Sequence, residues 1–405
     1  MVDIRTVTVF ANPGFPIDCD VITRAGRIAA DLRAALQEAG FTVQTTRFAS
    51  APFPGLARPD EVVDFARELQ ARCLAHGFEY VTIGPARPGD PPGAFAAIPD
   101  ALEVTTAAFA SAVIATHERG IDLSAVRAAA SIIHRNARIG SDGFANLRFA
   151  ALANVPPGIP FLPASYHDGG QPVAALGVEG APAAVLACQE SPSLEAAGDR
   201  MVELVEHDAS RMASVVERAL AGGDARFGGI DFSLAPFPDQ ARSTCAAVER
   251  LMGGRTGDAG TVAAAAWLAS TLDRARFSRA GFSGLFFPVF EDAVLAGRAD
   301  QDLLTVQDLL LYSTVCGTGL DTVPLPGRID EGAIAAILMD MAALALRLDK
   351  PLTARLMPIP GAREGDPVRF DFPFFAPSRV IDPRAYALDG LMWNSERASI
   401  EPRSR

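Results

Sequence analysis

The sequence predicts an α/β protein in which strands and helices alternate along the chain. Three observations point to this class. Segments with strand-like alternation of polar and apolar residues, such as 5–10 and 41–48, are separated by stretches with helical periodicity. Hydrophobic residues make up 49% of the chain and charged residues 21%, which is typical of a globular protein with a large core. The 405 residues suffice for two or three average domains or one large α/β barrel with additions.

The first half of the chain follows a β-α-β-α-β order. After the strand at 5–10, Asp20 can cap a helix over 21–39, and strand 41–48, helix 60–76 and strand 80–83 follow. This order implies parallel strands joined by crossover helices. Two alanine-rich segments, 100–117 and 123–138, are expected to be helices. Residues 139–170 are expected to form a long functional loop, because aromatic anchors argue against disorder.

The second half continues the alternation and ends in a short tail. Strands are expected at 173–178, 229–234, 352–357 and 369–374, and helices at 195–221, 241–252, 262–274, 291–295, 306–314 and 331–348. The segment 315–327 is expected to be a polar loop between two apolar helices. No linker divides the chain, so residues 1–395 are expected to form a single domain and 396–405 a flexible C-terminal tail.

Charge and cysteine content exclude several classes of function. The formal net charge of −12 and the lack of any basic run argue against nucleic-acid binding. The sequence has neither a signal peptide at its start nor an uninterrupted apolar run long enough to cross a bilayer, so no membrane partner is expected. Five scattered cysteines without a CxxC pair indicate a reducing, cytoplasmic location. The apolar content favours a homodimer or larger assembly.

The strongest site candidate is the segment 312–327, YSTVCGTGLDTVPLPG. Two glycines after Cys316 permit close backbone approach, and Thr318 and Asp321 add polar groups. The thiol could act as nucleophile or acid/base, with the carboxylate as base or cation ligand. The alternative is a Schellman-type helix end with a buried structural cysteine.

A second candidate is the segment 134–167. Arg135 and Arg138 share a helix face and could bind a carboxylate or phosphate. The alternative is that they only offset the helix dipole. Further hydrogen-bonding candidates are the acid/base residue His134 and, towards the far end of the segment, Asn154, Tyr166 and His167.

Two further segments carry acidic groups. Asp231 and Ser233 lie two apart on an expected strand and so point to one face, where they could meet a ligand or cap the next turn. Glu291 and Asp292 follow an apolar run, and their carboxylates could bind a cation or could merely begin a helix. The segment 253–261, GGRTGDAGT, lacks the spacing of a phosphate loop and is interpreted as a helix–helix connection.

Several of these segments together resemble the UPF0210 family, also called DUF711. The residues that carry the resemblance are GIDFSLAP (229–236), FSGLFFPVFEDAVLA (282–296), LLLYSTVCGTGLDTVPLPG (309–327) and KPLTARLMPIPG (350–361). The resemblance implies a single ten-stranded α/β barrel of the pyruvate formate-lyase-like fold, as in glycyl radical enzymes. It also implies a loop inserted into the barrel that bears Cys316. No RVxGY-like radical segment or iron–sulfur motif accompanies it.

The expected function is an enzyme that acts on a small anionic metabolite inside the barrel, as a lyase, isomerase or hydrolase. Cys316 would work with Asp321, Asp231 or Glu291, and Arg135, Arg138 and Arg355 would recognise the anion. One alternative is a metal-assisted enzyme with Mg²⁺ or Ca²⁺ as cofactor. Its candidate ligands are Asp231, Glu291, Asp292 and Asp321. The other alternative is a non-catalytic metabolite-binding or regulatory protein. No nucleotide motif is present.

Overall fold

A mostly parallel sheet of eleven strands forms the centre of the protein. The computed structural model describes residues 2–403. The main path of the sheet runs β8-β7-β1-β2-β3-β4-β6-β10-β9, and β5 and β13 extend from β4. The strands are β1 (Asp3–Phe10), β2 (Val43–Ala49), β3 (Tyr80–Ala86), β4 (Ala108–Thr116), β5 (Gly120–Asp122), β6 (Phe149–Ala153), β7 (Val173–Glu179), β8 (Arg226–Asp231), β9 (Gly319–Pro326), β10 (Leu352–Ile359) and β13 (Arg397–Ala398).

The β-α-β-α-β order predicted for the first half is confirmed. Parallel pairing joins β1 to β2, β2 to β3 and β3 to β4, whereas β1–β7 and β6–β10 are antiparallel. A separate pair, β11 (Pro367–Val368) and β12 (Ser378–Arg379), lies near the end of the chain.

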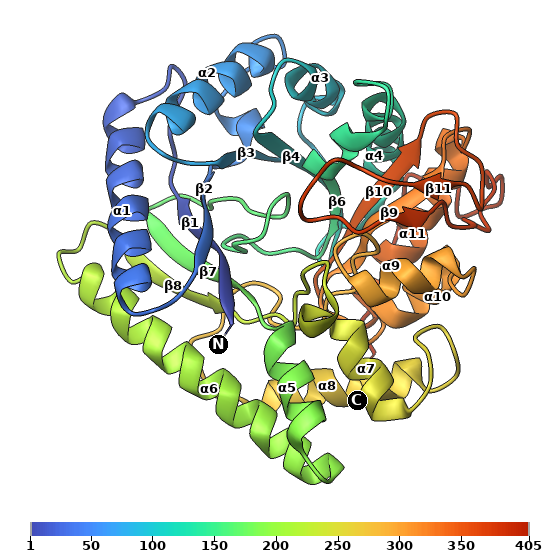
Figure 1. Ribbon diagram of the computed structural model, residues 1–405. Helices are drawn as coiled ribbons and strands as arrows, with labels where there is room; N and C mark the ends of the chain where they lie inside the picture. The colour runs from blue at the N-terminus through green and yellow to red at the C-terminus, as the bar shows by residue number, and fades with distance from the viewer. Residues whose placement is uncertain (1, 404–405) are drawn as a thin grey trace.

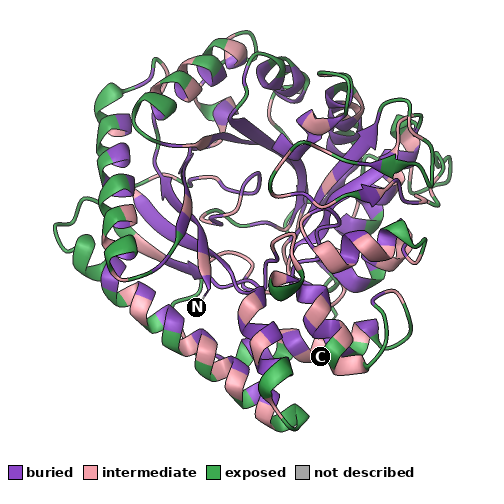
Figure 2. Ribbon diagram, in the orientation of Figure 1, coloured by how far each residue is buried: buried purple, intermediate pink, exposed green. Residues whose placement is uncertain are grey.

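The helices cover one side of the sheet, which curves so that they lie on its outside (Figure 1). They are α1 (Cys19–Glu38), α2 (Val62–Ala75), α3 (Pro92–Glu103), α4 (Leu123–Asn136), α5 (Ala181–Glu190), α6 (Leu194–Ala219), α7 (Thr244–Met252), α8 (Thr261–Arg274), α9 (Ala293–Asp300), α10 (Val306–Ser313) and α11 (Glu331–Arg347). Alternate residues of β1, Val7 and Val9, are fully buried in the hydrophobic core that includes Ile22 and Leu32 of α1. Figure 2 shows the same division, with buried strands and helices exposed on their outer faces.

The inner side of the curved sheet is occupied by irregular chain rather than by helices. The segment 154–172, between β6 and β7, crosses this side (Figure 1), and the hydroxyl of Thr8 donates to the carbonyl oxygen of Pro160 there at 2.8 Å. A second irregular segment, 282–290, runs between the two edge strands. Isolated bridges pair Leu285 with Leu234, just after β8, and Pro288 with Asp321 of β9.

Four sequence predictions about local structure are wrong. The segment 139–170 is not one long loop, because it contains the short helical turn Phe144–Arg148 and the sheet strand β6. The segment 315–327 is not an inserted loop, because α10 ends at Ser313 and Gly319–Pro326 is the edge strand β9. The alanine-rich segment 100–117 is not one helix but the end of α3 followed by β4. Alanine favours helices in isolation, but β4 lies between β3 and β6, where burial of a continuous apolar run overrides that preference. Residues 369–374 form no strand.

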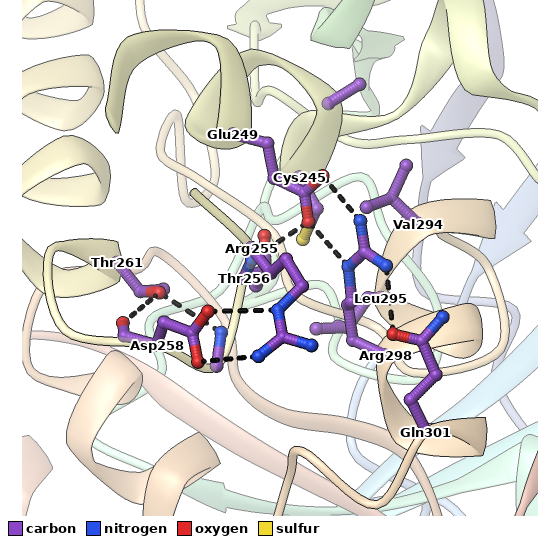
Figure 3. A network of polar contacts seen from close by, with 12 residues as sticks. Cys245, Glu249, Arg255, Thr256, Asp258, Thr261, Val294, Leu295, Arg298 and Gln301 are labelled. Atoms are coloured by element: carbon purple, nitrogen blue, oxygen red, sulfur yellow. Dashed lines mark hydrogen bonds and ion pairs between the residues drawn. The ribbon is translucent and has the colours of Figure 1, made fainter. Parts of the chain in front are cut away.

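The C-terminal segment and the connection between α7 and α8 both contact the rest of the molecule. The expected tail contributes β13, which pairs antiparallel with β5. The interpretation of 253–261 as a helix–helix connection between α7 and α8 is confirmed, and Figure 3 shows its polar contacts. Glu249 of α7 accepts hydrogen bonds from the backbone N–H of Thr256 at 2.8 Å and from both Nε and Nη2 of Arg298 at 2.7 Å.

Candidate functional site

A cavity of about 180 Å³ lies on the inner side of the sheet. The inner segment 154–172 supplies residues 161–164 to its wall, and β1, β2, β9 and β10 supply charged side chains. Six charged residues line it: Arg5, Arg47, Arg148, Glu291, Asp321 and Arg355. Eight aromatic side chains also line it: Tyr80, Phe109, Phe144, Phe161, Phe282, Phe286, Phe372 and Phe374.

A chain of ion pairs runs through the floor of the cavity. Nε of Arg5 lies 2.5 Å from Oε1 of Glu179, and Nη2 of Arg5 lies 3.2 Å from Oε2 of Glu291. The other oxygen of Glu291 accepts from Nη2 of Arg355 at 2.8 Å, and Nε of Arg355 donates to Asp321. Each side chain in this chain is at most 13% exposed, so the charges interact with little screening by solvent.

Bulges in two strands position Arg5 and Asp321 in this series of ion pairs. Ile4 and Thr6 of β1 pair with the consecutive residues Val178 and Gly177 of β7, so Arg5 is an extra residue in the ladder. In β9 the two residues Asp321 and Thr322 oppose the single residue Arg355 of β10. Such bulges redirect side chains next to active sites. Here they direct Arg5 and Asp321 to the cavity wall.

Arg47 is the one arginine of this wall without a strong partner among the described residues. Its Nε donates to the hydroxyl of Thr45 at 3.0 Å, and its guanidinium lies 5.7 Å from the ring centroid of Tyr80. No carboxylate pairs with it, and its Nη atoms form no hydrogen bond within residues 2–403. Burial, together with the charge of Arg5, lowers the pKa of Arg47 to about 9. A cation held in this way favours an anion beside it.

Arg148 lines the same cavity but is saturated by backbone. Its Nη1 donates to the carbonyl oxygen of Thr105 at 2.8 Å and to that of Ala108 at 3.3 Å. Its Nη2 donates to the carbonyl oxygen of Leu102 at 2.8 Å. Burial lowers the pKa of Arg148 to about 10. Arg148 therefore holds the end of α3 against β4, whereas the Nη atoms of Arg47 have no hydrogen-bond partner among the described residues.

The carboxylate of Asp321 is suited to hold a proton. Burial raises its pKa, with a further contribution from the charge of Glu291, against the lowering effect of Arg355. Burial alone would lower the pKa of Arg355, but the charges of Asp321 and Glu291 outweigh this and raise it. An acid with a raised pKa beside a fixed cation is an arrangement typical of general acid/base sites.

Comparison with known proteins gives the chain a family. A family model described as "Uncharacterised ACR (DUF711)" matches residues 1–375. The chain is 32% identical over 394 residues to a UPF0210 protein of Pyrobaculum arsenaticum, covering 90% of this chain and 86% of that protein. It is 29% identical over 418 residues to a UPF0210 protein of Acetivibrio thermocellus, covering 91% and 88%. The chain belongs to the DUF711 (UPF0210) family. The resemblance predicted from the motifs is confirmed over nearly the whole chain.

Four residues predicted from the sequence lie at the cavity of this DUF711 protein: Glu291, Thr318, Asp321 and Arg355. The hydroxyl oxygen of Thr318 is buried and has no hydrogen-bond partner among the described residues. It is therefore a second polar group, besides Arg47, that can serve a ligand.

Cys316 does not line the cavity. It is 2% exposed, and its Sγ accepts a hydrogen bond from the backbone N–H of Gly319 at 3.3 Å. Its carbonyl oxygen accepts from Nζ of Lys350, which also donates to the carbonyl oxygens of Ser313 and Thr314. These contacts fasten the turn between α10 and β9, and so help to position Thr318 and Asp321.

Asp231 and Ser233 lie behind the wall. The carboxylate of Asp231 accepts from the hydroxyl of Ser233 at 2.5 Å and from the backbone N–H groups of Phe282 and Ser283 at 2.7 and 2.9 Å. Burial raises the pKa of Asp231 to about 6, against these donors. Gly281 has a φ of +61°, and a Cβ there would lie 1.9 Å from Oδ2 of Asp231. Asp231 therefore anchors the segment whose Phe282 faces the cavity.

The residues predicted around 134–167 do not come together at the cavity. His134 pairs with Glu331 at 3.1 Å, Arg135 pairs with Asp100 at 2.7 Å, and Nη2 of Arg138 lies 3.4 Å from His134. These three contacts lie among exposed groups. The other predicted residues of this segment also have partners elsewhere. Nδ2 of Asn154 lies 2.9 Å from Nε2 of His117, and the hydroxyl of Tyr166 donates to the carbonyl oxygen of Val155. The backbone N–H of His167 donates to the carbonyl oxygen of Ser50.

The acidic residues considered for a metal site are also separated. Asp292 is fully buried and caps α9, accepting from Ser243 and from the backbone N–H groups of Val294, Leu295 and Cys245. Of these four residues, Glu291 and Asp321 line the same cavity, and both are paired with Arg355. Within residues 2–403, no three His, Cys, Asp or Glu side chains gather as a metal site. No helix in the described part of the chain is long and apolar enough to cross a membrane.

Sequence reasoning missed Arg5, Arg47, Arg148 and Glu179. A signal for Arg47 was present: Thr45 and Arg47 lie two apart in an expected strand, so both point to one face. A polar pair on one face of a buried parallel strand indicates a ligand site more strongly than a pair of arginines on an exposed helix.

Proposed function

We propose that this protein is an enzyme that acts on a small anionic metabolite bound in the cavity. The observation that carries the proposal is Arg47, a buried guanidinium that lines the cavity and has no carboxylate partner among the described residues. An isolated buried cation is costly, and a bound anion removes that cost. The hydroxyl of Thr318, which has no hydrogen-bond partner among the described residues, also supports a polar ligand in the cavity.

In this proposal Asp321 is the general acid/base, and Arg355 stabilises negative charge that develops on the substrate. The raised pKa of Asp321 supports a proton-carrying role. Glu291 bridges Arg5 and Arg355 and fixes both guanidinium groups. Proton transfer assisted by an adjacent cation suits a lyase or isomerase, and in general any reaction through an enolate-like intermediate. Cys316 has a structural role in this scheme, since its thiol faces the turn at Gly319.

The fold that goes with this proposal is a closed α/β barrel whose interior is the cavity. Two bridges support closure, because the segment 282–290 contacts Leu234 after β8 on one side and Asp321 of β9 on the other. The segment inserted into the barrel would then be 154–172, whose residues 161–164 line the cavity.

A non-catalytic metabolite-binding protein is the second candidate. The observation that favours it is that Glu291 and Asp321 are both held in ion pairs with Arg355, which limits their freedom to exchange protons. Both candidates need Arg47, but only the enzyme needs Asp321 to transfer a proton.

Ligand binding and proton exchange together test the proposal. Wild-type protein is titrated with small carboxylates and phosphate, and binding is read from thermal stabilisation. Ligands that bind are then incubated in D₂O, and deuterium at the carbon next to the carboxyl or carbonyl group is measured by NMR. The enzyme proposal expects exchange that Asp321→Asn abolishes without abolishing binding. Binding without exchange supports the second candidate, and failure of every anion to bind refutes both.

A further inference from the structure

We infer that the ligand is a monocarboxylate with an apolar, preferably aromatic, body, and that its carboxylate binds the two Nη atoms of Arg47. This inference rests on the proposed function and narrows it from small anions in general to one chemical class. It follows from the charge around the cavity, the geometry of Arg47 and the composition of the wall.

The charges favour a single negative charge on the ligand. The ion-pair chain contains three carboxylates, Glu179, Glu291 and Asp321, and two of the four arginines at the cavity. With Arg47 and Arg148 included, the surplus is one positive charge while Asp321 is ionised, which is the state in which it can act as a base. A monoanion neutralises it, whereas a phosphate or dicarboxylate dianion would bring a second charge close to Glu291 and Asp321 without a cation to match it.

The geometry of Arg47 favours a planar, two-oxygen acceptor. Thr45 occupies Nε, and the face of Tyr80 lies 5.7 Å away, so the plane of the guanidinium is held. The hydroxyl of Thr45 is itself fixed, because it donates to the carbonyl oxygen of Arg5 at 2.7 Å. The two Nη atoms then present parallel donors, which match the two oxygens of a carboxylate.

The wall favours an apolar body on the carboxylate. Two aromatic clusters line the cavity. In one, the rings of Phe161 and Phe282 meet that of Phe286 edge-on at 5.2 and 5.7 Å. In the other, Phe372 lies 5.2 Å from both Phe144 and Phe374. Such rings bind another ring in edge-to-face or offset geometry, and they offer little hydrogen bonding to a sugar or a polyol.

The size of the cavity limits the ligand further. About 180 Å³ lies below the range of roughly 300–1,000 Å³ that holds drug-sized molecules. A phenyl ring with a short carboxylate arm is of suitable size for this space.

Calorimetric titration with five probes tests this inference: phenylacetate, its neutral amide phenylacetamide, acetate, succinate and inorganic phosphate. We expect phenylacetate to bind most tightly, with phenylacetamide and acetate each weaker by at least about tenfold, because one lacks the charge and the other the apolar body. Arg47→Gln is expected to weaken phenylacetate by at least about tenfold. Arg135→Gln, which removes an exposed arginine paired with Asp100, is the matched control and should bind phenylacetate as the wild type does.

The outcomes separate the inference from the proposed function. Tighter, Arg47-dependent binding of phosphate or succinate overturns the monocarboxylate class but leaves an anion site. Tighter, Arg47-dependent binding of acetate overturns the apolar body. No binding by any anion overturns the proposed function as well. Equal loss in Arg135→Gln, or equal binding of phenylacetamide and phenylacetate, overturns the role of Arg47. The amide comparison uses only wild-type protein, so it decides the question even if Arg47→Gln does not fold.

Discussion

Replacement of Arg47 by methionine should stabilise the ligand-free protein, which is the opposite of the usual effect of a buried substitution. The pKa of Arg47 falls from 12.5 to about 9, and this corresponds to a cost of about 5 kcal/mol for the charged side chain in the folded state. The guanidinium is charged at neutral pH in both folded and unfolded protein, so the folded protein carries this cost in full. The cost would decrease only as the pH rises above about 9.

Methionine removes the charge but also some contacts. The hydrogen bond to Thr45 and the contact with Tyr80 together offset about 2–3 kcal/mol of the gain. Thr45 keeps its own bond to the carbonyl oxygen of Arg5, so no buried group is orphaned. The net expectation is a free energy of unfolding higher by about 2 kcal/mol and, for a chain of 405 residues, a Tm higher by about 2–3 °C.

Arg148→Met is the matched control, since Arg148 lines the same cavity and is as deeply buried. It leaves the carbonyl oxygens of Leu102, Thr105 and Ala108 without their donor, at a cost of about 3–5 kcal/mol. Removal of the charge, whose pKa is lowered to about 10, returns about 3 kcal/mol of this. Differential scanning calorimetry in anion-free buffer should therefore show a higher Tm for Arg47→Met and an unchanged or lower Tm for Arg148→Met. A lower Tm for Arg47→Met would refute the view that Arg47 is an uncompensated cation.

Four further predictions address other residues. Glu291→Gln removes the carboxylate between Arg5 and Arg355, so it should lower the free energy of unfolding by about 3–5 kcal/mol. Because it also removes a negative charge from the cavity wall, calorimetry should show tighter binding of phosphate. Unchanged phosphate affinity would contradict this expectation. Cys316→Ala should lower Tm and leave anion binding in place, weakened at most slightly through the turn before Thr318. Abolished binding would return Cys316 to the site. Burial lowers the pKa of His167, so the free energy of unfolding should fall as the pH drops below the unfolded pKa of about 6.5. Urea unfolding at pH 7 and pH 5 should show a smaller change in this free energy for His167→Asn than for the wild type. An equal change would count against a role of His167 in the pH dependence. Gly281→Ala should strongly destabilise the protein, because the φ of Gly281 is +61° and the new Cβ would clash with Asp231. The control Gly222→Ala, whose new Cβ has nothing within 4 Å, should be neutral. Similar urea midpoints for the two variants would refute the predicted clash.

The sequence predicted part of the site because some of its signals are local. Glu291, Thr318, Asp321 and Arg355 lie in the motifs that carry the family resemblance, and all four line the cavity. Arg135 also gave a local signal, from its spacing with Arg138, but its partner is the exposed Asp100. Helical spacing shows which side chains share a face. It does not show whether that face is turned to solvent.

The sequence by itself determined the α/β class and the parallel order of the first strands, because both follow from short-range periodicity. It also determined family membership, since the motifs are contiguous. Only the tertiary structure decided that 108–116 is a strand and that 319–326 is an edge of the sheet, because pairing with neighbouring strands overrides local preference. It alone joined Arg5 to Glu291, which are 286 positions apart. Bulges in β1 and β9 turn Arg5 and Asp321 to the same cavity. That no carboxylate pairs with Arg47 within residues 2–403 is likewise a property of the folded chain, because it depends on which side chains the other described elements bring to the cavity wall.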